Sequence, residues 1–201
     1  MPYTAEHKQQ SREKILQSAI ACFTKQGFEN TSIDEIMQNA EMTRGAFYAH
    51  FSSKSELYQQ ALLTGAMNSQ LVKPKPDDVS DREWMNLLVK GYLSENHIQQ
   101  KLPPCPMAFL VTDVAVSEPE VRQTYTKIFK GMNKMVYNFT KQFSDCDEEQ
   151  IYAVTAMLIG AVAIGRVLDN RQVRQKMLSG CETLALAMLN GEIPCVETIK
   201  T

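Results

Sequence analysis

Hydrophobic residues recur along most of this 201-residue chain with the spacing of amphipathic helices. In the first segment, apolar residues return on one helical face from Ile15 to Phe23, and the pattern ends before Gly27. Glycine is the usual residue just beyond a helix end. No segment alternates convincingly between apolar and polar residues, which is the pattern of a half-buried strand. We therefore expect an all-α protein.

Helix start signals divide the following part of the chain into short helices. Ser32 with Glu35, and Ser53 with Glu56, form capping-box patterns. Between the two boxes, a tight turn and a candidate cap at Thr43 predict a third short helix. Helices of this length are unstable in water by themselves. We therefore expect two of them to pack on the first helix as a tri-helical helix-turn-helix unit, which presents its third helix to the DNA major groove.

A linker with two prolines indicates how the chain is divided into domains. The run Lys73–Asp78 (KPKPDD) is the one clear linker in an otherwise helical pattern. Before it, we expect a helix-turn-helix DNA-binding domain over residues 1–55, with a connecting helix over residues 53–71. After it, five more periodic runs predict a ligand-binding and dimerisation domain over residues 80–195. The whole chain is thus expected to contain about nine helices.

Two of the later helices have distinctive starts. A short apolar helix is expected from about residue 106 to residue 116. A capping-box pattern over residues 117–120 opens a long helix, whose apolar stripe continues to Phe143. Acidic residues at positions 147–149 begin the next helix, where the helix dipole favours negative charge.

The third short helix has one apolar face and one face of small residues. At the spacing of a helix, Phe47 and Phe51 share a face and are expected to dock on the tri-helical core. Gly45, Ala46 and Ala49 then point outward. Small outward residues would allow the helix backbone to lie deep in a DNA groove.

Charge around this helix is more informative than the charge of the whole chain. The net charge is −2, and residues 1–60 contain six Lys or Arg against seven Asp or Glu. This balance counts against a histone-like or coating protein, which needs an excess of positive charge. Residues 43–55, however, contain no acidic residue at all. DNA binding is therefore expected to depend on local charge placement.

The same segment resembles the recognition helix of a known family. The sequence SIDEI at residues 32–36, followed by TRGAFYAHFSSKSEL at residues 43–57, is similar to that of TetR/AcrR regulators. The family pattern T/S-K/R-G-x-F/L-Y-x-H/Y-F-x-s-K-x-x-L is matched at nearly every position. The resemblance covers roughly residues 10–58. It implies a dimeric, ligand-responsive repressor that binds a palindromic operator in double-stranded DNA and is released by an inducer.

The resemblance also implies which side chains meet DNA. Base-edge or phosphate contacts fall on Thr43, Arg44, Gly45 and Ala46, and phosphate contacts fall on Thr31, Tyr48, His50 and Lys54. The alternative is that Tyr48 and His50 merely cover the tri-helical core, while Lys54 is a solvated residue at a helix start.

The segment Ile151–Leu168 is apolar almost throughout. A membrane span is one explanation by length. Arg166 near the end of the segment and the lack of flanking aromatic residues argue against a span. A helix that packs on its own domain and on a second subunit explains the pattern better. The resemblance implies the same contact, a four-helix bundle formed by the last two helices of each subunit. The expected interface residues are Ala156, Gly160, Ala163, Leu184 and Met188.

Large apolar and aromatic residues between the linker and this segment are candidates for an apolar or amphipathic ligand site. They are Trp84, Leu88, Tyr92, Met107, Phe109, Asp113, Tyr125, Phe129, Met132 and Met157. Each of them could instead be ordinary core. Asp113 is an acid on an apolar helix, where it would read a cationic or hydroxylated ligand or cap a neighbouring helix.

The remaining chemistry of the chain does not indicate an enzyme. There is no GxGxxG, P-loop, GxSxG or HExxH motif, and the three histidines are scattered. The chain also has no secretory signal and no cysteine pair or cluster with metal-ligand spacing. We therefore expect a cytoplasmic protein without metal or cofactor. Five cysteines are expected as thiols, namely Cys22, Cys105, Cys146, Cys181 and Cys195.

Two alternatives to a ligand-induced repressor remain at this point. Cys105 follows two prolines and is expected at a helix start, where the helix dipole would favour a thiolate. Redox or electrophile sensing by Cys105 is therefore one alternative. The other is a helical adaptor that keeps the fold but binds protein rather than DNA.

Overall fold

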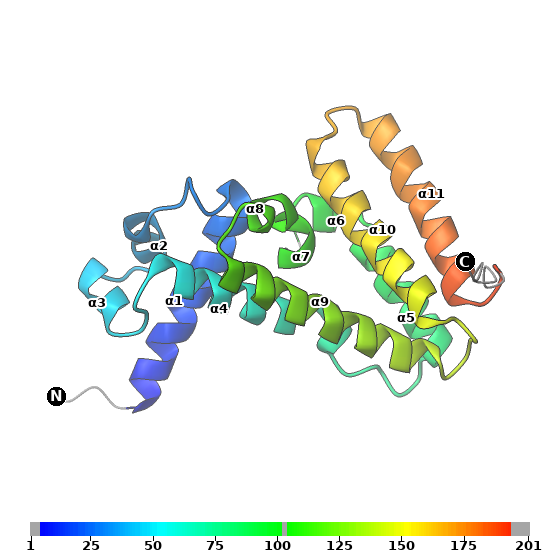
Figure 1. Cartoon of the computed structure of the whole chain (residues 1–201), viewed down its shortest axis with the longest axis horizontal. Coiled ribbons are helices and arrows are strands. Elements are labelled where there is room, and N and C mark those ends of the chain that lie inside the picture. The colour runs from blue at the N-terminus through cyan, green and yellow to red at the C-terminus, as the bar shows by residue number, and fades with distance from the viewer. Residues whose placement is uncertain (1–4, 102–103, 194–201) are drawn as a thin grey trace. The chain divides into compact units, whose positions relative to one another are not determined.

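The computed structural model describes residues 5–101 and 104–193, and these residues form only helices and their connections (Figure 1). The expected all-α fold is confirmed. In chain order the elements are α1 (Ala5–Gln26), α2 (Ile33–Asn39), α3 (Arg44–Tyr48), α4 (Lys54–Met67), a 3-10 turn η1 (Gln70–Val72), α5 (Asp81–Tyr92), α6 (Glu95–Ile98), α7 (Pro106–Phe109), α8 (Val111–Ala115), α9 (Pro119–Thr140), α10 (Glu148–Val167) and α11 (Arg171–Leu189).

The described residues thus contain eleven α-helices rather than about nine, and two short segments account for the difference. The helix expected over residues 106–116 is divided into α7 and α8, because the backbone leaves the helical region at Leu110 (φ −120°, ψ 9°). The single turn α6 was not expected from the sequence. Ser94 caps its start, because the Ser94 hydroxyl oxygen accepts a hydrogen bond from the backbone N–H of His97.

Three helix ends also differ from the expectation. The connecting helix ends at Met67 instead of continuing to residue 71, and η1 follows it. The third helix ends at Tyr48, so Phe51 lies beyond it. The long helix α9 ends at Thr140 and does not reach Phe143. In each case apolar residues continue beyond the observed helix end. Their periodicity is the reason why the sequence predicted a later end.

Only part of the predicted capping chemistry forms. The hydroxyls of Ser32 and Ser53 accept the backbone N–H groups three residues later, as expected. The reciprocal hydrogen bond of a capping box, from the serine backbone N–H to the glutamate side chain, is not formed at Ser32 or at Ser53. Glu35 instead accepts from the Gln26 side chain, and Glu56 accepts from the backbone and hydroxyl of Ser52.

Of the two later helix starts, the capping box expected at residues 117–120 does not form, whereas the acidic residues expected at the start of α10 are confirmed there. At residues 117–120 the Ser117 hydroxyl donates backward to the Asp113 carbonyl instead of capping α9. A complete capping box forms at the start of α10. There the Asp147 carboxylate accepts from Gln150 N (2.8 Å), and the Gln150 side chain accepts from Asp147 N (3.0 Å).

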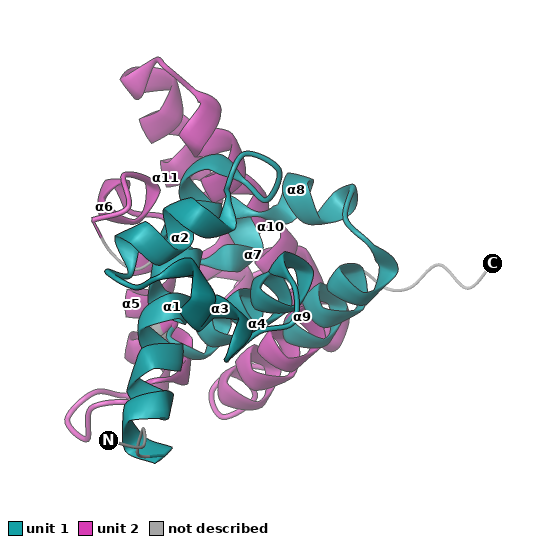
Figure 2. Cartoon of the chain, turned by 90° about the vertical axis from the view of Figure 1, so that its left-hand side faces the viewer, with its two compact units in different colours: residues 1–68, 104–128 teal, residues 69–103, 129–201 magenta. Residues whose placement is uncertain are grey.

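The chain divides into two compact units, whose boundaries fall around residue 68, residue 103 and within α9 (Figure 2). The first unit contains the described residues of ranges 1–68 and 104–128. The second contains those of ranges 69–103 and 129–201. The helix-turn-helix thus shares its unit with α7, α8 and the first part of α9. The division of the chain into domains at residues 55 and 80 stays a prediction.

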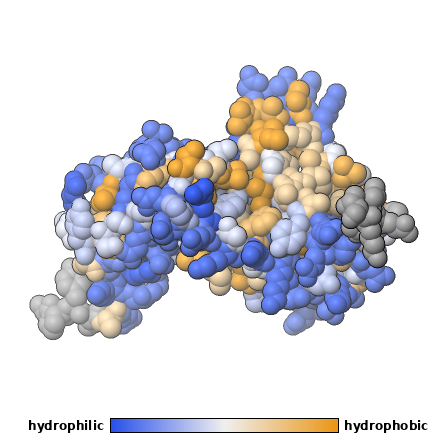
Figure 3. Space-filling view, in the orientation of Figure 1, coloured by the Kyte–Doolittle hydropathy of each residue, from blue (hydrophilic) through white to orange (hydrophobic). Residues whose placement is uncertain are grey.

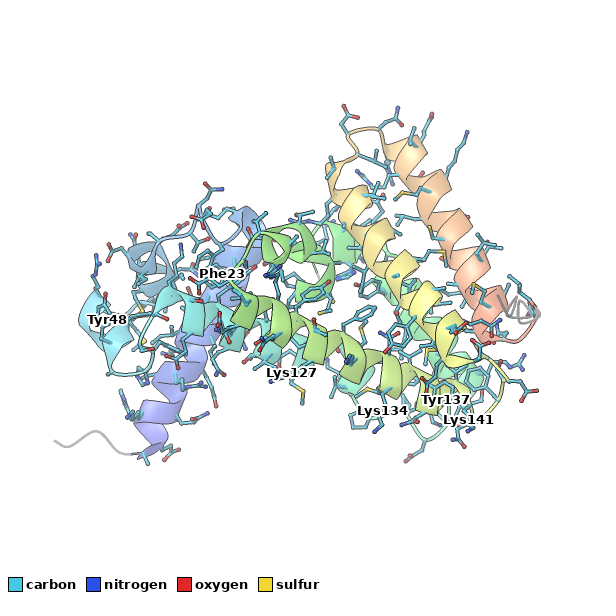
Figure 4. The ribbon with its side chains drawn as sticks, in the orientation of Figure 1. Phe23, Tyr48, Lys127, Lys134, Tyr137 and Lys141 are labelled. Atoms are coloured by element: carbon cyan, nitrogen blue, oxygen red, sulfur yellow. The ribbon has the colours of Figure 1, made fainter. Side chains whose placement is uncertain are left out.

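Aromatic residues dominate the core of the first unit. Phe23 of α1 is completely buried, and its ring meets the ring of Tyr58 from α4 edge-on at 4.8 Å (Figure 4). Phe28 lies 5.0 Å from the same tyrosine ring. Phe47 and Phe51 are buried as expected, with 5.8 Å between their ring centroids. Large aromatic side chains contribute much buried area per residue, which suits a unit built from short helices.

Asp113 of α8 joins three segments of the first unit. Its Oδ2 accepts a hydrogen bond from the Tyr58 hydroxyl (2.6 Å) and another from the backbone N–H of Phe28 (3.0 Å). Gly27 lies beside it with φ +81°, and a Cβ added there would lie 2.9 Å from Asp113 Oδ1. Burial and the Asp113 carboxylate both raise the pKa of Tyr58, so the hydroxyl remains a donor. The sequence left two roles open for Asp113, recognition of a ligand and capping of a neighbouring helix. The structure shows a contact of the second kind, just beyond the end of α1.

The second unit centres on α10 and α11, which lie side by side (Figure 1). A Cβ added at Gly165 would lie 2.9 Å from the Ile98 side chain, so glycine permits the close approach of α10 and α6. A buried polar pair crosses the core, where the Thr155 hydroxyl donates to the Asn133 side chain over 2.6 Å. Arg174 and Glu95 form an ion pair at 3.0 Å.

Among the described residues, α10 is the one helix long and apolar enough to cross a membrane. About 39% of its apolar window is buried within this chain. Asp147 caps its start through a capping box, and Arg166 lies in its last turn. These polar ends and the buried face are typical of a helix in the core of a folded domain.

Candidate nucleic-acid interface

The turn between α2 and α3 fixes the geometry of the reading head, by which we mean α1, α2, α3 and their connections. Glu41 has φ +57°, an uncommon conformation for a residue other than glycine. The next residue, Met42, donates its backbone N–H to the carbonyl of Met37 over 2.8 Å. The Ser18 hydroxyl of α1 donates to the Ile36 carbonyl (2.7 Å), which holds α2 on α1.

The outer face of α3 is accessible, as the sequence predicts. Phe47 is completely buried, whereas Thr43, Arg44 and Gly45 are exposed and Tyr48 is 59% exposed. Figure 4 shows Tyr48 at the end of the molecule that carries α3. Its ring also meets the ring of the buried Phe47 edge-on at 5.1 Å, so a phosphate contact and a role in covering the core both stay open for Tyr48. Ala46 is half-buried. The face therefore combines small residues with one cation and one phenol.

Arg44 has a partner that the sequence did not reveal. Its guanidinium donates to the Asp34 carboxylate of α2 over 2.7 Å, although both side chains are about 60% exposed. Tyr48 and Asp34 raise the pKa of Arg44, which keeps it charged. Exposed ion pairs contribute little to stability because water screens them. The ion pair therefore adds little stability, and a base-edge or phosphate contact of Arg44 stays a prediction.

Lys54 is bonded within the protein. Its Nζ donates to the carbonyls of Phe28 (2.6 Å) and Thr31 (2.9 Å), and it lies 4.1 Å from the centroid of the Phe28 ring. Thr31 is only 1% exposed, and its hydroxyl donates to the Gly27 carbonyl over 2.7 Å. Both residues therefore stabilise the loop between α1 and α2. Their expected phosphate contacts stay a prediction.

His50 is half-buried next to two cations of α1. Its Nδ1 is buried and has no hydrogen-bond partner in the described part of the chain. Burial lowers the pKa of His50, and Lys8 and Arg12 lower it further, so the ring is neutral at pH 7. The Arg12 guanidinium also lies 5.2 Å from the centroid of the Phe51 ring. The structure thus adds Lys8 and Arg12 to the candidate interface.

Sequence reasoning missed Lys8 and Arg12 because they precede the recognition motif at residues 43–57 by 35 and 31 residues. Their spacing of four residues, which places both on one face of α1, was the available signal.

The candidate ligand residues fall in both units. Met107, Phe109, Asp113 and Tyr125 belong to the first unit, where Met107 and Phe109 are buried and the Tyr125 hydroxyl donates to the Met107 carbonyl over 2.7 Å. The others belong to the second unit and are half-buried, namely Trp84, Leu88, Tyr92, Phe129, Met132 and Met157. A ligand role for any of them stays a prediction.

The candidate interface residues lie on α10 and α11. Ala156 and Leu184 are exposed, and Gly160, Ala163 and Met188 are half-buried. Tyr152, Ile164, Val167 and Val173 on the same two helices also expose large apolar side chains. Figure 3 shows hydrophobic surface over this part of the second unit.

Cys105 is half-buried and immediately precedes α7. This helix has four residues, so its dipole offers a thiolate little stabilisation. No disulfide joins the described cysteines, while Cys195 lies outside the described residues.

Known proteins match the part of the chain that carries this interface. Residues 15–61 match the model of the family described as bacterial regulatory proteins, tetR family. The AcrR regulator of Shigella flexneri is 42% identical over 57 residues, which cover 28% of this chain and 26% of that protein. The chain belongs to the TetR/AcrR family. Its recognition motif and helix-turn-helix geometry are therefore those of a bacterial regulatory protein.

Other relatives of this TetR/AcrR member match it over a longer part. The regulator YxaF of Bacillus subtilis is 29% identical over 124 residues, 60% of this chain and 65% of that protein. The chain thus matches about a quarter to two thirds of the length of these curated relatives. The regulatory protein TetR from Rhodobacter sphaeroides has the same fold, with a TM-score of 0.74, 13% identity and coverage of 89% of this chain and 98% of that one. Reduced NemR of E. coli gives a TM-score of 0.70 at 16% identity, with coverage of 89% and 97%.

Replacing Lys54 with Met is expected to destabilise the protein by about 2 kcal/mol, because two backbone carbonyls lose a charged donor. Urea unfolding of the two proteins measures the difference. Lys14→Met, an exposed change on α1, is the control and should leave stability nearly unchanged. A stable Lys54→Met variant with weaker DNA binding would instead make Lys54 a phosphate contact.

Proposed function

We propose that this TetR/AcrR member is a transcriptional repressor that binds a palindromic operator in double-stranded DNA as a homodimer. A small apolar or amphipathic inducer releases it. The proposal includes no enzymatic activity, metal or cofactor, and it places the protein in the cytoplasm. The observation that carries it is the outer face of α3, where Arg44, Gly45 and Tyr48 are exposed above a buried Phe47.

This face has the properties that groove reading requires. Gly45 has only the Thr43 side chain within 4 Å of an added Cβ, so the backbone at the start of α3 is open to a close approach. Arginine at the beginning of a recognition helix can bind guanine O6 and N7 with two hydrogen bonds. Lys8 and Arg12 supply nearby positive charge for phosphates. Base reading is thus assigned to Arg44, and backbone positioning to the cations of α1.

Replacing Arg44 with Ala is expected to weaken operator binding roughly ten- to a hundredfold, because discrimination at one base pair is lost. Binding to random duplex DNA should change much less. Lys8→Gln is the matched control, which should weaken both DNAs and flatten the salt dependence by about one phosphate. Fluorescence anisotropy over a range of salt concentrations measures both effects.

Two results would contradict this assignment. Equal losses on operator and random DNA for Arg44→Ala would reduce Arg44 to a phosphate contact. If the wild-type protein bound no duplex at all, the adaptor alternative would replace the proposed function.

The homodimer is supported by the apolar face that α10 and α11 leave exposed. Ile164 and Leu184 are each 52% exposed, and Val167 is 83% exposed. A Cβ added at Gly160 would meet nothing within 4 Å in this chain, which leaves room there for a second helix. An exposed apolar surface on two adjacent helices is typical of a subunit interface. We assign the contact to these helices around a two-fold axis.

Gly160→Glu is expected to convert the dimer to monomers or aggregates, because each copy would place an unpaired carboxylate at the contact. Analytical ultracentrifugation measures the oligomeric state. Gly91→Glu on α5 is the control, since an added Cβ there also meets nothing and the site lies off α10 and α11. A Gly160→Glu protein that sediments as the wild type does would move the interface elsewhere.

Induction is proposed to act through α4, which follows the reading head directly in the chain. A two-fold dimer must hold its two recognition helices about 34–36 Å apart to enter successive major grooves. A small tilt of α4 would change this spacing. The ligand must bind the two states with different affinities, because tight binding to both would shift nothing. A coupling of about 1–3 kcal/mol would suffice for release.

Linkage gives the test of induction. An inducer that lowers operator affinity must itself bind the operator complex more weakly by the same factor, about 5- to 150-fold. Titrating the inducer into the protein alone and into the protein–operator complex, by calorimetry, measures both affinities. Random DNA in place of operator is the control. Equal affinities for the two forms would overturn induction, even if the ligand site were real.

A further inference from the structure

The helix α9 and the turn that follows it carry a concentration of positive charge that the reading head does not explain. Residues 121–144 contain five basic residues and no acidic one, on a chain whose net charge is −2. Within the second unit, this segment supplies Lys130, Lys134 and Lys141, and all three are exposed. In the described part of the chain none of them takes part in an ion pair.

These lysines lie on one side of α9. Successive helical residues turn by about 100°, so the three positions fall within an arc of about 40° and along about 16 Å of helix axis. Lys134 and Lys141 extend from the same edge of the helix in Figure 4, and the Lys141 ammonium lies 5.5 Å from the centroid of the Tyr137 ring. A different side of the helix, roughly 110° around its axis from the lysines, is buried through Asn133, Val136 and Thr140.

A fourth cation comes from α5. The Arg82 guanidinium donates to the Phe143 carbonyl over 3.3 Å and lies 5.6 Å from the centroid of the Phe143 ring. This contact places Arg82 beside the C-terminal end of α9. Asp81 and Glu83 flank Arg82, but Asp81 is paired with Lys75 at 3.4 Å. Asp145 is the nearest acid that follows Lys141 in the sequence. We call Arg82, Lys130, Lys134 and Lys141 the α9 basic surface.

An ordinary solvated helix face would mix the two signs of charge. Lysines at positions i and i+4, such as Lys130 and Lys134, repel each other and weaken the helix, whereas a Glu–Lys pair would strengthen it. This segment of α9 keeps the repulsion without an acid to relieve it. A partner with regularly spaced negative charges would relieve it.

The composition of the surface discriminates between anionic partners. Protein interfaces are poor in lysine and depend on buried aromatic and arginine anchors, and this surface is mostly lysine. Single-stranded nucleic acids require exposed aromatic rings for stacking, and Tyr137 is half-buried. Membrane surfaces with so few cations also need apolar side chains that insert, and among the described residues of α9 only Met135, at 38% exposure, offers a large exposed one. Duplex phosphates require only lysines on an exposed helix.

We propose that the α9 basic surface is a second binding site for double-stranded DNA, which contacts the phosphate backbone without reading sequence. It is distinct from the reading head and does not depend on it. Each subunit would then carry one sequence-reading site and one site for any duplex.

The test uses the full chain with its reading head disabled by Lys8→Gln, Arg12→Gln, Arg44→Ala and Tyr48→Ala, which remove both its phosphate-binding cations and its base-reading side chains. In that background, Lys130→Gln, Lys134→Gln and Lys141→Gln are combined, and binding to a random 30-base-pair duplex is followed by anisotropy between about 50 and 200 mM salt. The plot of log affinity against log salt should become shallower by about three, since each lost phosphate contact contributes about 0.9.

The matched control combines Lys73→Gln, Lys90→Gln and Lys101→Gln, three exposed lysines of the same unit that lie off α10 and α11. It removes the same net charge away from the α9 basic surface and should lower the slope by less than one. Equal effects of the two triple variants would overturn the proposal, because general charge would then explain the binding.

Two further arms separate the other partners. One arm measures binding to a polyglutamate peptide, and the other measures binding to phosphatidylserine vesicles. If the α9 triple variant loses binding to one of these while its duplex binding is unchanged, the surface belongs to that partner and the proposal fails. The outcome is also separable from the proposed function. The wild-type head on operator DNA tests sequence reading, whereas every measurement on the α9 basic surface uses the disabled head.

Discussion

A helix that ends inside a protein leaves backbone groups that must find partners, and the end of α1 shows how this unit satisfies them. Lys54 donates to the carbonyls of Phe28 and Thr31, and Asp113 accepts from Phe28 N and from the Tyr58 hydroxyl. One short loop thus binds α4 and α8 to α1. The position of α2 and α3 follows from it, because both continue directly from this loop.

The contacts of that loop link the reading head to α8. Asp113 is the single acid of α8, and its contacts reach the end of α1 and the middle of α4. The hydrogen bond between Asp113 and Tyr58 therefore joins α8 directly to the helix that follows the reading head. This connection supports induction through α4 by a direct hydrogen-bonded route within one unit, with no need for a change in the fold of the recognition helix.

The distribution of charge and of apolar surface assigns different tasks to different helices. The apolar surface that α10 and α11 leave exposed suits a second copy of the chain, and the lysines of α9 suit a polyanion. The cations of α1 and α3 lie around a recognition helix with a small-residue face. The net charge of −2 gives no indication of this segregation, because it is a sum over the whole chain. Local placement of charge, and not its sum, decides where an anion can bind.

The sequence by itself determined the helical class, the family and the buried face of α3, because helical periodicity and the recognition motif are local properties. Phe47 is buried and Tyr48 exposed, as their spacing predicts. Only the tertiary structure decided the partners of long side chains. The Asp34 contact of Arg44, the two carbonyls at Lys54 and the bridging role of Asp113 join residues 10 to 85 positions apart. Periodicity carries no information about such pairs, since each side chain reaches a group that another helix brings near it.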